Sequence, residues 1–304
     1  MLDTTKALLT SVFFATLFVP IAATAAEPVR WFDDRGRPVT EAVVSTETLG
    51  ADSLLLGELH DNPNHHLVQA RLLQNLVTSG RDVVVVWEML RRDQQDIIDA
   101  YLAQPNADAD GFAQRVGWAE SGWPDWSFYR PIADVAIKAG LPMVAGGLEE
   151  GEVGRLIGQD LDAWGEARGW SVPALNDEER DRHLTAVFDG HCGLVPKERL
   201  APMVTVQRAR DLSLAYAMLQ TDQLTAAVLI SGNGHVRSDI GVPHILRRMA
   251  PGARMLVIGQ NEGAPDTPAE PTDRYDWIGV SRVIERPDPC EALRRHFGGH
   301  KNDG

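Results

Sequence analysis

Short apolar runs alternate with longer segments of helical periodicity along most of this chain. The run Val83–Val86 is continuously apolar, which is typical of a strand buried on both faces of a sheet. Such alternation predicts an α/β fold with a mostly parallel central sheet flanked by helices. The predicted strands are Ser53–Leu56, Asp82–Trp87, Pro142–Ala145, Ala226–Ile230, Met255–Ile258 and Ile278–Ile284, and the predicted helices are 64–79, 92–103, 128–139, 177–189, 198–221 and 241–250.

The pattern also predicts how the chain is divided. Residues 27–297 read as one α/β domain, and the mostly helical region 147–222 reads as an insertion or cap between its halves. Gly263–Asp273, rich in proline, alanine and acidic residues, predicts an exposed loop, and 298–304 predict a flexible tail.

The first 26 residues have the pattern of a secretory signal peptide. Lys6 precedes an apolar run from Ala7 to Ala23, and Ala23-Thr24-Ala25 supplies small residues at the cleavage spacing. The alternative is an uncleaved membrane anchor, which Pro20 and the alanine-rich end disfavour. Because no cysteine lies near the cleavage site to accept a lipid, we expect a cleaved, soluble protein that is secreted or periplasmic.

Two predicted strands end in the same motif. Gly57 and His60 follow the strand Ser53–Leu56 with the spacing Gly-x-x-His, and Gly232 and His235 repeat that spacing after Ala226–Ile230. The repetition predicts two related halves. In an open α/β sheet, ligands bind at the carboxyl ends of the strands.

Two carboxylates accompany these imidazoles, because Glu58 lies inside the first motif and Glu88 ends the strand Asp82–Trp87. If the strands are parallel neighbours, Glu58, His60, Glu88 and His235 converge in one crevice. This set suits a divalent transition metal such as manganese or cobalt, or acid–base catalysis without a metal. Each residue also has a structural alternative, in which the imidazoles close turns and Glu88 pairs with a neighbouring arginine.

Aromatic side chains gather between Trp118 and Tyr129, and Arg130 follows directly. A segment this rich in tryptophan predicts either the wall of a pocket for a flat apolar ligand or a lid packed on the core. Tyr129 is the tyrosine nearest to this cluster. Gln207 and Asp211 lie on one helical face at i, i+4, where they either line the site or face solvent.

The net charge argues against one class of partner, and the cysteine content leaves open whether the chain has a disulfide. The formal net charge of -14 argues against nucleic acid, because binding to phosphates needs a basic surface. Cys192 and Cys290 are the two cysteines. In an oxidising compartment they either pair or remain two buried free thiols, and sequence alone leaves both open.

The ordered motifs together resemble the ChaN-like haem-binding family, within the wider Tiki, TraB and erythromycin-esterase superfamily. The resemblance covers roughly residues 45–260. The residues that carry it are Leu56-Gly57-Glu58-Leu59-His60-Asp61-Asn62-Pro63, His65-His66, Gln69, Trp87-Glu88-Met89, Trp126-Ser127-Phe128-Tyr129-Arg130-Pro131, His191-Cys192-Gly193, Gln207 with Asp211, and Gly232-Asn233-Gly234-His235.

The resemblance implies a role in haem or iron uptake, with haem held by a tyrosine and paired haems in a homodimer, and with possible membrane-associated uptake components. We take Tyr129 as the candidate ligand, and Arg130, His66, Trp126 and His191 as further haem-binding residues. The alternative is a metal-dependent peptidase or esterase that uses Glu58, His60, Glu88 and His235. No Cys-x-x-Cys-His is present for covalent haem attachment.

Overall fold

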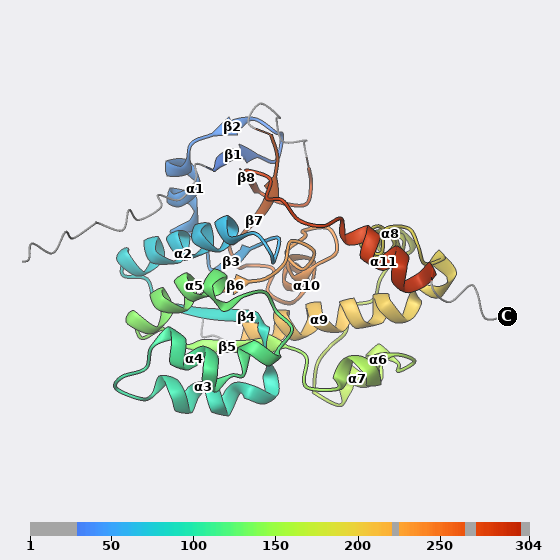
Figure 1. Cartoon of the computed structure of the whole chain (residues 1–304), viewed down its shortest axis with the longest axis horizontal. Coiled ribbons are helices and arrows are strands. Elements are labelled where there is room, and N and C mark those ends of the chain that lie inside the picture. The colour runs from blue at the N-terminus through green and yellow to red at the C-terminus, as the bar shows by residue number, and fades with distance from the viewer. Residues whose placement is uncertain (1–28, 221–224, 265–271, 299–304) are drawn as a thin grey trace, which may run out of the picture.

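The computed structural model describes residues 29–220, 225–264 and 272–298, and their strands form one eight-stranded sheet (Figure 1). The order across the sheet is β2-β1-β8-β7-β3-β6-β4-β5. The six strands from β8 to β5 run parallel, while β1 pairs antiparallel with both β2 and β8. The strands are β1 (Arg30–Asp33), β2 (Pro38–Val39), β3 (Ser53–Leu56), β4 (Val83–Arg91), β5 (Met143–Gly147), β6 (Ala226–Ile230), β7 (Met255–Glu262) and β8 (Trp277–Ser281).

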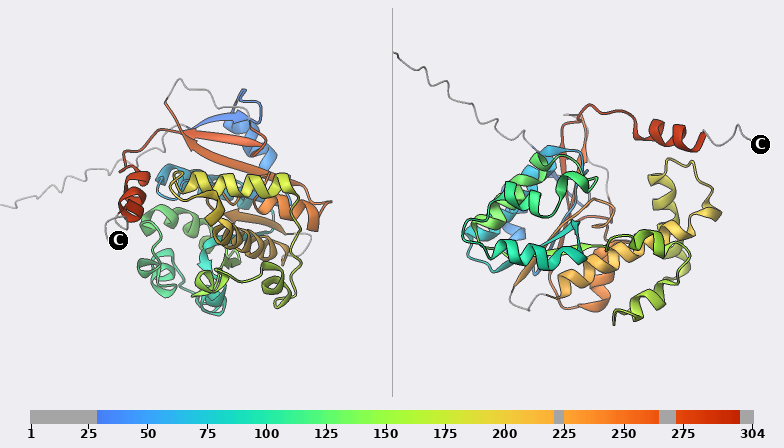
Figure 2. Two further views of the ribbon diagram at one scale, coloured as in Figure 1. Left: turned by 90° about the vertical axis from the view of Figure 1, so that its right-hand side faces the viewer. Right: turned by 60° about the horizontal axis from the view of Figure 1, so that its bottom comes forward.

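Helices cover both faces of this sheet (Figures 1 and 2). The predicted mostly parallel sheet flanked by helices is therefore confirmed. The described helices are α1 (Glu41–Thr48), α2 (Pro63–Thr78), α3 (Gln95–Leu102), α4 (Ala109–Arg115), α5 (Trp126–Lys138), α6 (Glu152–Leu156), α7 (Leu161–Glu166), α8 (Asp177–Gly190), α9 (Ala201–Leu219), α10 (Val242–Met249) and α11 (Pro289–Gly298), with 3-10 turns at Arg92–Gln94, Trp118–Glu120 and Lys197–Arg199.

The apolar strands are buried on both faces, as the continuous run in β4 predicts. Val83 and Val85 pack with α2 and α5 in one hydrophobic cluster, while Val84 and Val86 pack with α9 and α10 in the other. Successive side chains of a strand point to opposite faces, so a strand covered on both sides needs no polar alternation.

The described part of the segment between β5 and β6 contains the helices α6 to α9, joined by loops. The sequence predicts mostly helical structure here, and the role of residues 147–222 as an insertion or cap stays a prediction. The last helix of the segment, α9, packs directly on β5, β4 and β6, so it serves as part of the layer that covers the sheet.

Several boundaries differ from the prediction. β4 continues past Trp87 to Arg91, with a register shift against β5, so Glu88 lies within the strand rather than just after it. β7 continues to Glu262, and the antiparallel strands β1 and β2 were not predicted from the pattern. The segments that form β1 and β2 are short and lack a distinctive period. They become strands because β1 pairs with β8 and β2 pairs with β1.

Local chemistry explains where the helix after β3 begins. The side chain of Asn62 accepts a hydrogen bond from the Asn64 backbone N–H, which caps α2, and Pro63 occupies the first turn of the helix. Proline suits this position because its missing N–H has no partner inside a helix. The cap ends the loop that carries Glu58 and His60 and starts α2 at a fixed point.

A disulfide joins Cys192, just after α8, to Cys290 in α11, which lies away from the sheet (Figure 2). This resolves the alternatives that the sequence left open for the two cysteines. The predicted signal peptide lies outside the described residues, as does the predicted tail apart from Gly298. Within the part of the chain that the structure describes, no helix combines the length and apolar character needed to cross a membrane.

Candidate functional site

The three strands that carry the predicted site residues are neighbours in the sheet. β6 lies between β3 and β4, and all three run parallel. Their carboxyl ends therefore meet at one edge, where His60 follows β3, His235 follows β6 and Glu88 lies near the end of β4. Both imidazoles contact the Glu88 carboxylate, with Nε2 of His60 at 4.0 Å and Nε2 of His235 at 3.2 Å. The structure thus brings His60, Glu88 and His235 together at this edge, while their functional roles stay a prediction.

Glu58 is the buried centre of the first half of the site. Its Oε1 accepts hydrogen bonds from His60 Nδ1 at 2.7 Å and from the Tyr129 hydroxyl at 2.6 Å, and its Oε2 lies 3.2 Å from His66 Nε2. Burial by itself raises the pKa of Glu58, but the His66 and His60 imidazoles outweigh it and hold that pKa well below its usual range. Glu58 is therefore an anion that orients the His60 ring.

Glu88 is the centre of the second half. Its Oε2 accepts from the Gly232 backbone N–H at 2.8 Å and from the Ser231 hydroxyl at 3.0 Å, while its Oε1 faces His235. His235 Nδ1 in turn donates to Asp211 Oδ1 at 2.6 Å. Burial lowers the pKa of His235, but the carboxylates of Glu88 and Asp211 outweigh it, so the pKa of this imidazole is raised. His235 is held as a cation between two carboxylates.

The loops of the two Gly-x-x-His motifs pack against each other. A Cβ on Gly57 would clash with Oδ1 of Asn233 in the second motif. A Cβ on Gly232 would lie 2.7 Å from Nε2 of His60 in the first motif. Because each glycine leaves room for a side chain of the other loop, both loops can pack closely at the sheet edge.

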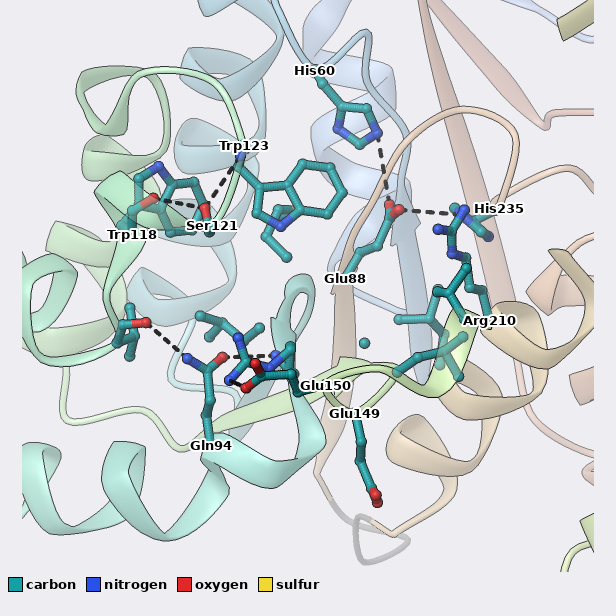
Figure 3. A pocket seen from close by; sticks show the side chains of 18 of the residues that line it. His60, Glu88, Gln94, Trp118, Ser121, Trp123, Glu149, Glu150, Arg210 and His235 are labelled. Atoms are coloured by element: carbon teal, nitrogen blue, oxygen red, sulfur yellow. Dashed lines mark hydrogen bonds and ion pairs between the residues drawn. The ribbon is translucent and has the colours of Figure 1, made fainter. Parts of the chain in front are cut away.

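A cavity of about 520 Å³ opens above this edge (Figure 3). His60, Glu88 and His235 form part of its lining. Trp118 and Trp123 lie on the side opposite His235, and the Trp123 ring packs edge-on against His60 with a centroid distance of 4.9 Å. Other lining residues are Met89, Leu90, Arg91, Gln94, Val116, Ser121, Gly147, Leu148, Glu149, Glu150, Gly151, Val153, Arg210 and Leu214.

The residues expected to bind haem do not line this cavity. Tyr129 is fully buried, and burial together with Glu58 raises its pKa far above the usual value. His66 is fully buried below the site. Trp126 packs on Trp118, the exposed Arg130 pairs with Asp110, and His191 bonds the Val187 carbonyl next to the disulfide. Binding of haem by these five residues stays a prediction, and iron ligation by Tyr129 would require its hydroxyl to leave Glu58.

The site also contains residues that the sequence pattern does not single out, and others whose role the pattern leaves open. Asp211 faces the site through His235, and the Gln207 amide lies 3.1 Å from the same imidazole. Ser231 and Arg210 were not singled out. The sequence does contain a hint for Arg210. It directly precedes Asp211 on a predicted helix, and Gln207 and Asp211 already lie on one polar face of that helix.

The metal alternative is not supported by the geometry. Among the described residues, no group of three or more histidine, cysteine, aspartate and glutamate side chains is arranged to hold a metal ion. The four predicted ligands are instead hydrogen-bonded or ion-paired with each other and with their neighbours. The groups form two hydrogen-bonded or ion-paired sets, His60 with Glu58 and His235 with Glu88, and 4.0 Å separates His60 from Glu88.

The chain is similar to known proteins over most of its length. Residues 44–246 match the model of a family described as haem-binding uptake, Tiki superfamily, ChaN. No curated protein matches the chain.

A solved structure of a ChaN protein has the same fold. A structure of ChaN from Campylobacter jejuni, described as showing cofacial heme binding, is 18% identical, with a TM-score of 0.67 over 83% of this chain and 96% of that chain. A protein from Bacillus cereus (11% identical, 82% and 93% covered) and an erythromycin esterase mutant, EreC (13%, 88% and 86%), have TM-scores of 0.46 and 0.41.

Proposed function

We propose that this chain binds haem in the cavity at the sheet edge. The premise is that the chain belongs to the ChaN family of haem-binding uptake proteins in the Tiki superfamily. The observation that carries this proposal is the position of His60. Its Nδ1 is fixed by Glu58, while the ring lines the cavity and its side chain is 33% exposed.

His60 has the arrangement of a metal-binding histidine in a haem protein. An imidazole that donates one ring N–H to a carboxylate has its orientation fixed and its other nitrogen made a better ligand. Histidine is a common axial ligand of haem iron. If haem binds in this cavity, His60 is the residue that would hold it, and the haem would supply the iron for that imidazole.

The cavity also fits the flat apolar part of such a ligand. Trp118 and Trp123 form one wall, and Met89, Leu148 and Val153 add apolar surface. Its volume lies within the usual range for small-molecule sites.

We further propose that the protein works in haem or iron uptake outside the cytoplasm. The signal-peptide pattern of residues 1–26 supports this location, and so does the disulfide, because such bonds persist in oxidising compartments. A homodimer and membrane-associated uptake components belong to the same proposal.

Haemin titration of the purified mature protein tests this function, with the Soret absorption as readout. We expect saturable binding in the wild type, loss of the ligand-bound spectrum in His60→Ala, and an unchanged spectrum in His244→Ala, which removes a histidine that does not line the cavity. If Tyr129→Phe abolishes the spectrum and His60→Ala leaves it intact, the tyrosine is the ligand. A non-saturating response in the wild type would overturn haem binding.

A further inference from the structure

The charged side chains that line the cavity are almost all paired. Glu88 lies 3.2 Å from His235, Glu149 lies 3.1 Å from Arg92, and Glu150 lies 3.4 Å from Arg91. Each of these carboxylates has a cationic partner that neutralises its charge. The carboxylates that line the cavity therefore do not by themselves repel an anion.

Arg210 is the exception within the described part of the chain. It lines the cavity and is half-buried on α9, yet its guanidinium has no carboxylate within ion-pair distance. The neighbouring Asp211 is engaged by His235 at 2.6 Å instead. This is notable in a chain with 43 acidic and 29 basic residues, where carboxylates greatly outnumber the cations that can pair with them.

The position of Arg210 makes its charge available to a ligand. Figure 3 shows it next to His235, on the wall opposite Trp118 and Trp123. A half-buried guanidinium presents five N–H donors in a planar fork that matches a carboxylate, and lower exposure to water strengthens such a pair.

We propose that Arg210 is the binding subsite for a carboxylate group of the cavity's ligand. The ligand class is therefore a flat apolar molecule with at least one carboxylate, whose aromatic body lies towards Trp118 and Trp123 while its carboxylate meets the guanidinium. This proposal rests on the proposed function in one respect: if the ligand is haem, the carboxylate that meets Arg210 is a haem propionate.

Paired probes with and without a carboxylate test the subsite. The first pair is haemin and haemin dimethyl ester, followed by Soret absorption. The second pair is 2-naphthoate and 2-naphthamide, followed by quenching of tryptophan fluorescence, which requires no iron and no porphyrin. Each is titrated into the wild type, into Arg210→Gln, and into Arg199→Gln, which removes the same charge from an exposed position outside the cavity.

We expect the wild type and Arg199→Gln to prefer each carboxylate over its neutral analogue by about tenfold, and Arg210→Gln to lose that preference. A preference that is lost only for the naphthalene pair, with no saturable haemin binding, would support the subsite and reject haem as the ligand. If Arg210→Gln leaves both preferences unchanged, or if neither pair shows a preference in the wild type, the carboxylate subsite is wrong even where haemin binds.

Discussion

At the scale of single residues, the site depends on how closely the two loops approach each other. The His60 ring is held between the Glu58 carboxylate on one side and the backbone at Gly232 on the other. Neither contact involves a cofactor, so the orientation of the ring is a property of the folded chain. A change that adds one carbon at this contact has to move the ring.

Gly232→Ala is therefore expected to weaken haemin binding about tenfold, because its Cβ would lie 2.7 Å from His60 Nε2 and push the ring from its orientation. Gly234→Ala is the matched control in the same loop, since a Cβ there meets no atom within 4 Å. Haemin titration of both variants measures the difference. Equal affinity of Gly232→Ala and the wild type would show that the contact does not set the ligand geometry.

His65 gives a pH dependence of stability. Its Nδ1 accepts a hydrogen bond from the Leu59 backbone N–H at 2.9 Å, and its Nε2 lies 3.0 Å from the Ser281 hydroxyl, an arrangement that requires the neutral ring. Burial, with a smaller contribution from His66, lowers the pKa of His65 from 6.5 to about 4. The unfolded chain binds a proton below pH 6.5, whereas the native chain binds it only near pH 4.

The free energy of unfolding should thus fall as the pH drops from 6.5 to 4, by about 3 kcal/mol for this residue, and level off below. Urea unfolding across that window, for the wild type and for His65→Gln, measures it. The glutamine does not titrate, so the stability advantage of the wild type should shrink towards pH 4. A constant difference between the two proteins would contradict the assignment.

At the scale of elements, the exposed edge of the sheet at β5 is closed by a side chain. Gln95 in α3 accepts a hydrogen bond from the Ala145 backbone N–H at 2.8 Å and donates one to the Met143 carbonyl at 3.0 Å. Its amide thus takes the place of a neighbouring strand. This protects an edge that would otherwise be free to pair with another chain.

Gln95→Ala should lower the free energy of unfolding by about 1–3 kcal/mol, because it leaves two backbone groups of β5 without their partners. Gln74→Ala is the control, since among the described residues this exposed side chain bonds only to Thr78, and its loss should cost a few tenths of a kcal/mol. Urea denaturation compares the two. Similar losses in both variants would mean that the edge is satisfied in another way.

At the scale of the whole molecule, the disulfide links the C-terminal helix to the helical insertion. Cys192 and Cys290 are 98 residues apart, and the loop they close contains β6, β7 and β8. A crosslink over such a long loop restricts the unfolded chain strongly.

Replacing both cysteines by serine should lower the free energy of unfolding by about 2–4 kcal/mol. Thermal unfolding with and without a reducing agent measures this, and the reducing agent should destabilise the wild type while leaving the double variant unchanged. If the wild type proves insensitive to reduction under conditions that open the bond, the crosslink does not contribute to stability.

The sequence by itself determined the elements and the chemistry at their ends. The apolar runs of β3 and β6 and the two Gly-x-x-His motifs were readable because a strand's burial is recorded in consecutive residues, and so is the turn that follows it. The parallel sheet followed from the alternation of strands and helices.

Only the tertiary structure decided which groups meet. The placement of β6 between β3 and β4 puts both histidines on the Glu88 carboxylate, and the packing of α9 brings Arg210 and Asp211 to the same edge. The same packing turns the Tyr129 hydroxyl inward onto Glu58, away from the cavity. Contacts between residues far apart in the chain depend on how the faces of whole elements fit together, and that fit leaves no local period in the sequence.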